Sequence, residues 1–226
     1  MVFILSIIIP AYNEEKRIEK TLQEYLAYFP TSEIIVVLNG CTDRTMDIIK
    51  RYPVRYINIK ESIGKGKAII EGFKIATGDF ISFIDADNSV SARYLENLLN
   101  HINGFDGIIG SRWIDGGLYL GQSKIRLIAS KIYNLLTRII LGLKYHDTQC
   151  PCKIFRREII LEVLPKLHGF NYAFDTELLY MLKNKNILEY PVIFEHKKGS
   201  KIRLFRDARK MFYTLLWLRL KNVRKM

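Results

Sequence analysis

Two carboxylates follow a short apolar run near the middle of the chain. The run Phe80–Ile84 is typical of a buried strand, and Asp85 and Asp87 come directly after it. Residues two apart in an extended chain point to the same side, so both carboxylates can face one point beyond the strand end. Because close carboxylates repel one another and their oxygens suit Mg²⁺ or Mn²⁺, the pattern favours a divalent-cation site. The same two residues could instead cap the helix that follows.

A glycine- and lysine-rich segment, Gly64–Lys67, lies upstream of these acids. Gly64 and Gly66 would let the backbone approach a ligand closely, and Lys65 and Lys67 offer positive charge. The segment matches neither the dinucleotide-binding fingerprint nor the Walker loop, because the third glycine and the Lys-Ser/Thr ending are missing. Taken alone, it is more typical of a turn before a helix than of a phosphate site.

Further candidate groups lie in the second half of the chain. Asp175 and Glu177 fall at the start of an expected helix, where acids are favoured by the helix dipole whether or not they bind anything. The segment His196–Arg203, which includes Lys201 and Arg203, is a basic loop able to hold an anion. Both groups therefore have a structural as well as a functional interpretation.

Strand-like and helix-like segments alternate along the chain with short turns between them. This alternation predicts an α/β domain with a mostly parallel central sheet flanked by helices. Pro10 is expected to end the first strand, and a helix is expected from Tyr12 to Tyr28. The expected strands are Phe3–Ile9, Glu33–Leu38, Val54–Ile59, Phe80–Ile84, Asp106–Arg112 and Pro191–Phe194.

In sheets of this kind, ligands bind beyond the carboxyl ends of the strands. Those ends supply Pro10–Glu14, Leu38–Asp43, Gly64–Lys67 and Asp85–Asp87. We therefore expect these four loop tips to converge on one cleft. Acids beside lysines in such a cleft favour a phosphate-bearing ligand.

The composition is that of a globular protein with a strong positive charge. The 226 residues are 49% hydrophobic and 26% charged, and the net charge is +12, which favours an anionic partner. Nucleic acid is disfavoured, because the aromatic platforms of RNA- and single-stranded-DNA-binding proteins are missing and acids gather where the ligand should lie. Cys41, Cys150 and Cys152 lack zinc-site spacing, and we expect reduced thiols in an intracellular protein.

Two basic segments show apolar residues at helical spacing. The segment from Ser123 to Leu143 is typical both of a packed helix and of a helix lying at a membrane surface. Leu204–Lys221 has the same character and adds Tyr213 and Trp217, so a membrane-surface role is favoured there. We find neither a signal peptide nor an uncharged apolar run of the ~20 residues that a membrane span requires.

Short motifs in a fixed order resemble those of a known family. They are Ile8–Glu15, Gly40–Thr45, Gly64–Ala68, Asp85–Asp87, Gly110–Arg112, Asp147–Cys150, Phe174–Tyr180 and Gly199–Lys201. With them the chain resembles the inverting GT-A glycosyltransferases of family 2, and within these the polyprenyl-phosphate sugar synthases. The last four motifs are most similar to the dolichyl-phosphate β-glucosyltransferases, which use UDP-glucose.

The resemblance implies a domain organisation and a set of site residues. A GT-A (nucleotide-diphospho-sugar transferase) fold would cover residues 1–203, with a nucleotide-sugar-binding half over 1–112 and an acceptor half over 113–203. A basic amphipathic helix, a membrane-associating tail, would follow over 204–226. The nucleotide sugar would be bound by Pro10, Tyr12, Glu14, Asn39, Gly64, Lys65, Lys67, Asp85, Ala86 and Asp87.

The same resemblance implies roles in metal binding, catalysis and acceptor binding. Asp85 and Asp87 would hold a Mg²⁺ or Mn²⁺ ion on the diphosphate. Catalytic roles would fall to Asp87, Arg112, Asp147, Asp175 and Glu177. The acceptor phosphate would be bound by Arg112, Gln149, Lys201 and Arg203.

The sequence departs from the family pattern in three places. The usual Asp-Asp-Gly-Ser is here Leu38–Cys41, and the amide of Asn39, which both donates and accepts hydrogen bonds, leaves uridine and guanosine open. The usual Cys-Gly-Phe is Cys150–Cys152, where Pro151 removes a backbone donor. Many longer relatives carry C-terminal transmembrane helices, whereas this sequence has a basic amphipathic segment.

We therefore expect an inverting, metal-dependent transferase that moves a hexose, with glucose from UDP-glucose preferred, to a polyprenyl (dolichyl) phosphate. The alternatives are a GDP-mannose-dependent dolichyl-phosphate mannose synthase, a family 2 transferase with a non-lipid glycan acceptor, and a catalytically silent scaffold. The expected location is cytoplasmic, peripheral on the cytoplasmic face of a membrane. The oligomeric state and the length of the lipid stay open.

Overall fold

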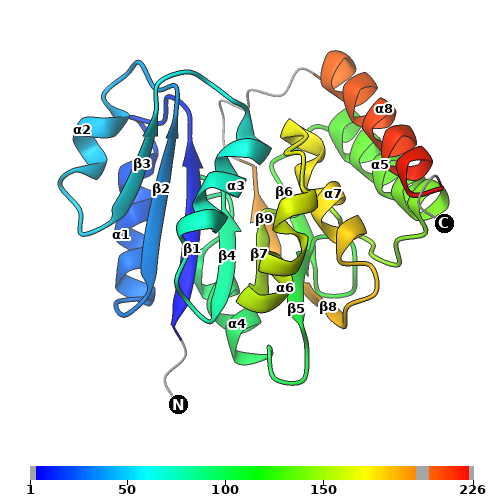
Figure 1. The fold of residues 1–226 in the computed structure, drawn as a ribbon, viewed down its shortest axis with the longest axis horizontal. Coiled ribbons are helices and arrows are strands. Elements are labelled where there is room, and N and C mark those ends of the chain that lie inside the picture. Colours follow the sequence, from blue (N-terminus) through cyan, green and yellow to red (C-terminus); the bar gives the residue numbers. More distant parts are fainter. Residues whose placement is uncertain (1–3, 197–203, 224–226) are drawn as a thin grey trace.

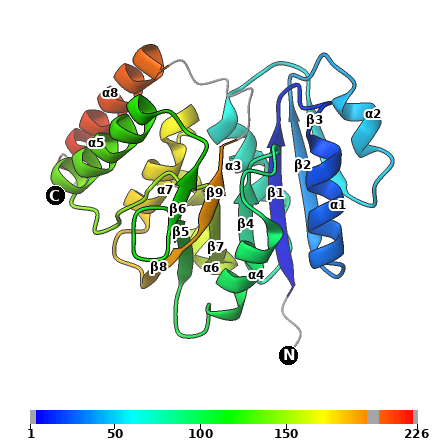
Figure 2. The same cartoon turned by 180° about the vertical axis from the view of Figure 1, so that it is seen from behind.

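The computed structural model describes residues 4–196 and 204–223. A seven-stranded sheet forms its centre, and helices cover both faces of the sheet (Figures 1 and 2). The strands of this sheet are β1 (Leu5–Ala11), β2 (Glu33–Asn39), β3 (Arg55–Ile59), β4 (Phe80–Ile84), β5 (Gly107–Ser111), β7 (Cys152–Arg156) and β8 (Ile187–Pro191). The helices are α1 (Ile18–Tyr28), α2 (Thr45–Ile49), α3 (Lys65–Ile75), α4 (Ala92–Asn100), α5 (Lys124–Leu141), α6 (Arg157–Val163), α7 (Phe174–Met181) and α8 (Leu204–Val223).

The strand order is β3-β2-β1-β4-β7-β5-β8, and only β7 runs antiparallel to its neighbours. The prediction of an α/β domain with a mostly parallel sheet is thus confirmed. Strand β7 was not predicted, because it follows a proline and its charged Lys153 interrupts the apolar run. Lys153 is nevertheless fully buried. A small parallel pair, β6 (Leu118–Leu120) with β9 (Ile193–Glu195), lies outside the main sheet.

The core forms two apolar layers, one on each face of the sheet. In β1, Ile7 and Ile9 belong to the layer under α1, α2 and α4, whereas Ile8 belongs to the layer under α3, α5, α6, α7 and α8. This alternation follows from the two-residue period of a strand. Both faces of β1 are therefore buried, which is why its sequence is a continuous apolar run.

The chain leaves β1 later than the sequence suggested. Pro10 lies within β1, in register with Val37 of β2, rather than ending the strand. Beyond Ile8, β1 is paired with β2 and no longer with β4, so a residue without an N–H group is accommodated. Helix α1 begins at Ile18 and not at Tyr12, because the intervening residues form a turn.

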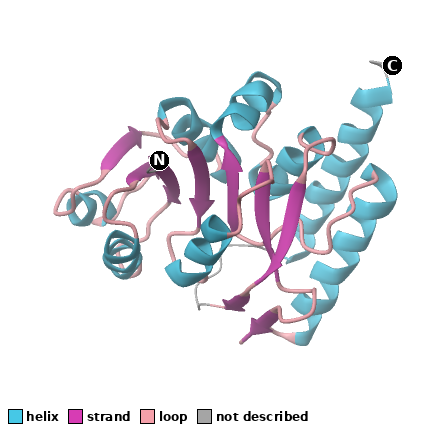
Figure 3. Ribbon diagram, turned by 90° about the horizontal axis from the view of Figure 1, so that it is seen from below, coloured by secondary structure: helices cyan, strands magenta, loops and turns pink. Residues whose placement is uncertain are grey.

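Helices α5 and α8 lie side by side at one edge of the molecule (Figures 1 and 3). In α8, Leu215 and Leu218 are buried in the same apolar layer as Tyr133 of α5. Within the described residues, we find no helix whose length and apolar character would let it cross a bilayer. The division into a transferase domain over residues 1–203 and a membrane-associating tail over 204–226 stays a prediction.

Candidate functional site

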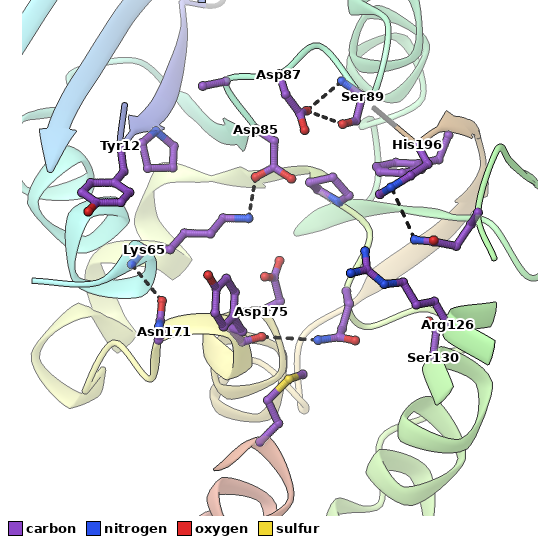
Figure 4. Close-up of a pocket in the computed structure, with 18 of the residues that line it drawn as sticks. Tyr12, Lys65, Asp85, Asp87, Ser89, Arg126, Ser130, Asn171, Asp175 and His196 are labelled. Carbon is purple, nitrogen blue, oxygen red and sulfur yellow. Dashed lines mark hydrogen bonds and ion pairs between the residues drawn. The ribbon is translucent and has the colours of Figure 1, made fainter. Parts of the chain in front are cut away.

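A cleft of about 670 Å³ opens at the carboxyl ends of the parallel strands. One wall is formed by residues from the ends of β1, β2 and β4 and from the start of α3, and it includes a residue of each of the four expected loop tips. The opposite wall is formed by α5, α7 and α8, by the segment that leads into α7 and by residues that follow β5, among them Arg112. Figure 4 shows Tyr12 and Lys65 on one side of this cleft and Arg126 and Ser130 on the other.

Lys65 and Asp85 form an ion pair inside the cleft. The ammonium of Lys65 donates to Oδ1 of Asp85 at 2.5 Å, and both side chains keep some exposure to solvent. Burial alone would lower the pKa of Lys65, but the carboxylates of Asp85 and Asp175 outweigh it and raise the pKa above its ordinary value. The cleft therefore holds a permanent positive charge beside its acids.

Asp87 is held at the mouth of the same cleft by its neighbours. One carboxylate oxygen accepts hydrogen bonds from the backbone N–H of Ser89, at 3.1 Å, and from the Ser89 hydroxyl. The guanidinium of Arg17 lies 3.7 Å from the other oxygen. Arg17 is itself held by two hydrogen bonds of 2.7 Å to the carboxylate of Glu14. Glu14 thus lines the cleft as the partner of Arg17.

The two aspartates fit a metal ion that arrives with a ligand. Among residues 4–196 and 204–223, no three His, Cys, Asp or Glu side chains gather closely enough to hold an ion. Mg²⁺ is commonly held by one or two carboxylates together with substrate phosphates. Asp85 and Asp87 both border the cleft and supply such carboxylates. The donor set therefore suits a metal–diphosphate complex rather than a resident metal.

Two asparagine side chains fix the loop that carries Lys65. Oδ1 of Asn39 accepts the backbone N–H of Ile63 at 2.8 Å, and Oδ1 of Asn171 accepts the backbone N–H of Lys65 at 3.1 Å. Gly64, between them, has a φ of 91°, which residues with a side chain rarely adopt. Asn39, Gly64 and Asn171 together fix the backbone at the start of α3, beside the cleft. Asn171 was not predicted as a site residue. The only feature of the sequence that pointed to it was its position just before the Phe174–Tyr180 motif.

Arg112 and Asp147 form a buried, bidentate ion pair. Nε and Nη2 of Arg112 donate to Asp147 at 2.6 and 2.9 Å, and the Arg112 backbone N–H donates at 3.0 Å. The guanidinium also stacks on the rings of Tyr119 and Phe194, at 4.6 and 5.1 Å from their centres. Burial would raise the pKa of Asp147, but Arg112 outweighs it and lowers the pKa. Arg112 borders the cleft, whereas Asp147 lies behind it.

Asp175 lines the cleft and forms an ion pair with the buried Lys153, which was not predicted as a site residue. The amine of Lys153, on β7, donates to Asp175 and to the Cys150 carbonyl, both at 2.5 Å. Gln149, also in the cleft wall, donates its amide to the carbonyl of Tyr172 at 3.3 Å. The Cys150 carbonyl thus helps to position the lysine that holds Asp175.

Glu177 and Lys67, two predicted site residues, do not border the cleft. The carboxylate of Glu177 is fully buried and accepts the backbone N–H groups of His168, Gly169 and Phe170 at 2.7, 3.0 and 3.3 Å. Lys67 packs beside Gly169. Both residues therefore shape the loop next to α3.

Two predicted residues are outside the described part of the chain, and several residues of the cleft were not predicted. Lys201 and Arg203 fall outside the described residues. The cleft residues that sequence motifs did not identify include Arg17, Ser89, Arg126, Ser130, Asn171, Tyr172, His196 and Met211. Most of them come from α5, α8 and loops without a motif, so only the fold brings them to the site.

The three cysteines are free thiols in buried or half-buried positions. Cys41, Cys150 and Cys152 are free thiols, and the latter two are buried. Burial raises the pKa of Cys150 to about 12 and the pKa of Cys152 well above its ordinary value. Buried thiols with raised pKa values are poor nucleophiles.

A family model decides where this protein belongs. Residues 6–164 match the model described as glycosyl transferase family 2. The chain belongs to this family. The matched range contains the first wall of the cleft, including Tyr12, Lys65, Asp85 and Asp87, and all of α5.

Two curated relatives of this family 2 chain differ in length. The human dolichyl-phosphate beta-glucosyltransferase is 30% identical over 243 residues, which cover 96% of this chain and 75% of the relative. Glycosyltransferase AglD of Haloferax volcanii is 30% identical over 218 residues, which cover 90% of this chain. The chain spans only about a third of AglD, 35% of its length.

Among solved structures, glucosyl-3-phosphoglycerate synthase from Mycobacterium tuberculosis in complex with UDP has a similar fold. Its TM-score is 0.69 at 18% identity, and the match covers 96% of this chain and 80% of that chain. The same synthase has also been crystallised with Mn²⁺, UDP-glucose and phosphoglyceric acid. The predicted GT-A fold is thereby confirmed for the family 2 chain.

Proposed function

We propose that the protein transfers glucose from UDP-glucose to the phosphate of a membrane polyprenol, with inversion at the anomeric carbon. The proposal is supported by relatives such as the human dolichyl-phosphate beta-glucosyltransferase, which is similar over 96% of this chain. The observation that carries it is the cleft itself. There, two aspartates at the end of β4 and the ammonium of Lys65 face a wall that contributes the guanidinium of Arg126.

On the first wall, the side chains would hold the donor. Pro10, Tyr12 and Asn39 line the part of the cleft nearest β1 and β2, where a nucleoside would lie. Lys65, charged at neutral pH, would lie against the diphosphate. A divalent ion held by Asp85 and Asp87 would neutralise charge on the departing diphosphate. Arg17, positioned by Glu14, adds positive charge beside Asp87.

On the opposite wall, the acceptor phosphate would attack the sugar. A phosphate oxygen forms the new bond to the anomeric carbon, and the bond to the UDP oxygen breaks with its electron pair leaving on UDP. The nucleophile is already an anion, so the step needs no strong general base, and positioning supplies the equivalent advantage. Asp175, held by Lys153, would orient the sugar beside this centre.

The acceptor is lipid-bound, so we place the protein on the cytoplasmic face of a membrane. The support comes from the apolar and basic character of α8, where Tyr213 and Trp217 are exposed. A soluble glycan acceptor would need no such surface.

The test is a transfer assay with defined donors and acceptors. Purified protein is given UDP-glucose or GDP-mannose, Mg²⁺ or Mn²⁺, and either a polyprenyl phosphate or a soluble glycan, and glycosylated product is measured. We expect glucosyl-phosphoryl-polyprenol from UDP-glucose with polyprenyl phosphate. No other combination of donor and acceptor should give product. Product only from GDP-mannose would instead support a dolichyl-phosphate mannose synthase. Product only on the soluble glycan would support a family 2 transferase with a non-lipid acceptor. Failure with every pair would reject transfer altogether.

A further inference from the structure

The segment that contains both cleft aspartates lies between β4 and α4 and forms neither strand nor helix. It covers residues 85–91 and follows the strand end at Ile84. Asp85 and Asp87 extend from it at the border of the cleft (Figure 4). Because a regular hydrogen-bond ladder does not fix such a segment, its conformation depends on contacts with other elements.

Helix α1 contacts this segment near both of its ends. The hydroxyl of Thr21 donates to the carbonyl of Ala86 at 2.9 Å. The hydroxyl of Tyr25 donates to the carbonyl of Val90 at 3.0 Å. Thr21 and Tyr25 are fully buried and lie four residues apart, on one face of α1. Ala86 and Val90 pack in the apolar layer beneath the same helix, so the segment is attached to α1 by polar and apolar contacts.

Glu24, also on α1, holds the middle of the segment and the start of α4. One carboxylate oxygen accepts the side-chain amide of Asn88 at 2.6 Å. The other accepts the Ser91 hydroxyl and the Ala92 backbone N–H, both at 2.8 Å. Burial would raise the pKa of Glu24, but these hydrogen bonds outweigh it and lower the pKa. Glu24 is therefore charged at neutral pH, and a charged acceptor strengthens each of the three bonds.

The contact with Asn88 goes beyond helix capping. A carboxylate at the start of α4 is expected on capping grounds alone, because the first N–H groups of a helix need acceptors. A cap accounts for the hydrogen bond from Ala92 but not for the one from Asn88, which directly follows Asp87. Asn88 has a φ of 56°, in the left-handed region that asparagine tolerates better than most residues. Glu24 thus fixes the turn by which the chain leaves Asp87.

We propose that Glu24 is a positioning residue for the donor: it holds the turn after Asp87 so that both aspartates face the metal–diphosphate complex. This inference rests on the proposed function, which supplies a metal-bound nucleotide. Glu24 does not border the cleft, so it acts through the segment and not on the ligand. Asp87 also has contacts with Ser89 and Arg17. Loss of Glu24 should therefore weaken the site without abolishing it.

The experiment measures binding of UDP by calorimetry, once with Mn²⁺ and once with EDTA, on proteins shown to be folded by circular dichroism. We expect Glu24→Ala to raise the Kd about tenfold with Mn²⁺ and less than about twofold with EDTA, because the segment carries the aspartates and not the nucleoside contacts. Glu24→Gln should raise it less, since its amide oxygen can still accept the N–H of Ala92. Glu19→Ala, on the same helix but bound to Arg51 and Tyr52, is the control and should bind like the wild type.

A double-substitution cycle tests whether Glu24 acts through the turn. Asn88→Gly removes the amide that Glu24 accepts and leaves a residue that readily adopts a positive φ. With Mn²⁺, we expect Glu24→Ala to weaken UDP binding by a smaller factor in the Asn88→Gly protein than in the wild type, because residues in one hydrogen-bond network are not additive.

Three results would overturn the positioning role. The first is an equal Kd of the wild type and Glu24→Ala with Mn²⁺. The second is an equal loss with Mn²⁺ and with EDTA, which is expected if Glu24 only stabilises the fold. The third is a pair of losses that multiply in the double variant. Because these measurements do not involve transfer, normal Mn²⁺-dependent binding of UDP beside a failed transfer assay would reject the proposed reaction and leave the role of Glu24 standing. A wild type that does not bind UDP would reject both.

Discussion

The two walls of the cleft use their charges differently. On the first wall, Lys65 and Asp85 form a pair whose side chains are 25 and 31% exposed. On the second, Arg112 and Asp147 are 5 and 0% exposed and share two side-chain hydrogen bonds. A partly exposed pair can exchange partners at little cost, whereas a buried pair cannot lose one member without a large loss of stability. The Lys65–Asp85 pair of the first wall is therefore available to a ligand, whereas the buried Arg112–Asp147 pair holds the backbone of the second.

The largest expected effect falls on activity alone and concerns Asp87. We expect Asp87→Asn to lower kcat/KM for transfer by about 10³-fold, because a charge that acts on the reacting diphosphate is lost. The thermal midpoint should change little, since Asp87 borders the open cleft. Asp115→Asn, at an exposed position, is the control. An Asp87→Asn variant with normal kinetics, or one that fails to fold, would contradict the contrast between the walls.

The next largest effect falls on stability and concerns Asp147. We expect Asp147→Asn to lower the free energy of unfolding by about 3 kcal/mol in urea titrations, because the Arg112 charge is left buried without its partner. Glu71→Gln, which breaks the surface pair with Lys74, should cost less than about 1 kcal/mol.

The pH dependence of the unfolding free energy tests the Arg112–Asp147 pair in a second way. The pKa of Asp147 is lowered in the folded protein, so its contribution to stability is present above the unfolded pKa and is lost as the pH falls. The gap in unfolding free energy between the wild type and Asp147→Asn should therefore shrink below about pH 4. A gap that stays constant down to strongly acidic pH would show that the ionised carboxylate is not what stabilises the fold.

Glu177 is expected to have an intermediate effect. Glu177→Gln should lower the free energy of unfolding by about 2 kcal/mol, because an amide cannot accept all the N–H groups that the carboxylate accepts. The KM for UDP-glucose should also rise, since this loop leads to Asn171, which holds the backbone of Lys65. Glu162→Gln, on the exposed side of α6, should change neither quantity. A changed kcat with unchanged stability would instead favour a direct catalytic role.

The smallest expected difference separates two neighbouring lysines. Lys65→Ala should raise the KM for UDP-glucose about tenfold, because a charge-assisted contact to the diphosphate is lost. Lys67→Ala should change it less than about twofold, because Lys67 packs beside Gly169 outside the cleft. Equal effects of the two substitutions would show that both lysines reach the donor.

Sequence reasoning predicted the first wall better than the second. The apolar run of β4 and the period of α3 place Asp85 and Lys65 at strand and helix ends, and these positions follow from local pattern alone. Lys153 and Arg126 could not be predicted in the same way. Lys153 lies on an antiparallel strand with no apolar run, and Arg126 reaches the cleft only because α5 packs against distant parts of the chain. Side chains brought together by tertiary packing leave no signal in neighbouring residues.

The packing of α8 has a practical consequence for anyone who shortens this protein. Leu215 and Leu218 of that helix are 0 and 1% exposed, and Ala208 and Met211 border the cleft. Deleting the helix would open the hydrophobic interior and remove part of the site in the same step. An inactive truncated protein would therefore say little about attachment to lipid, and single substitutions on the outer surface are the informative experiment.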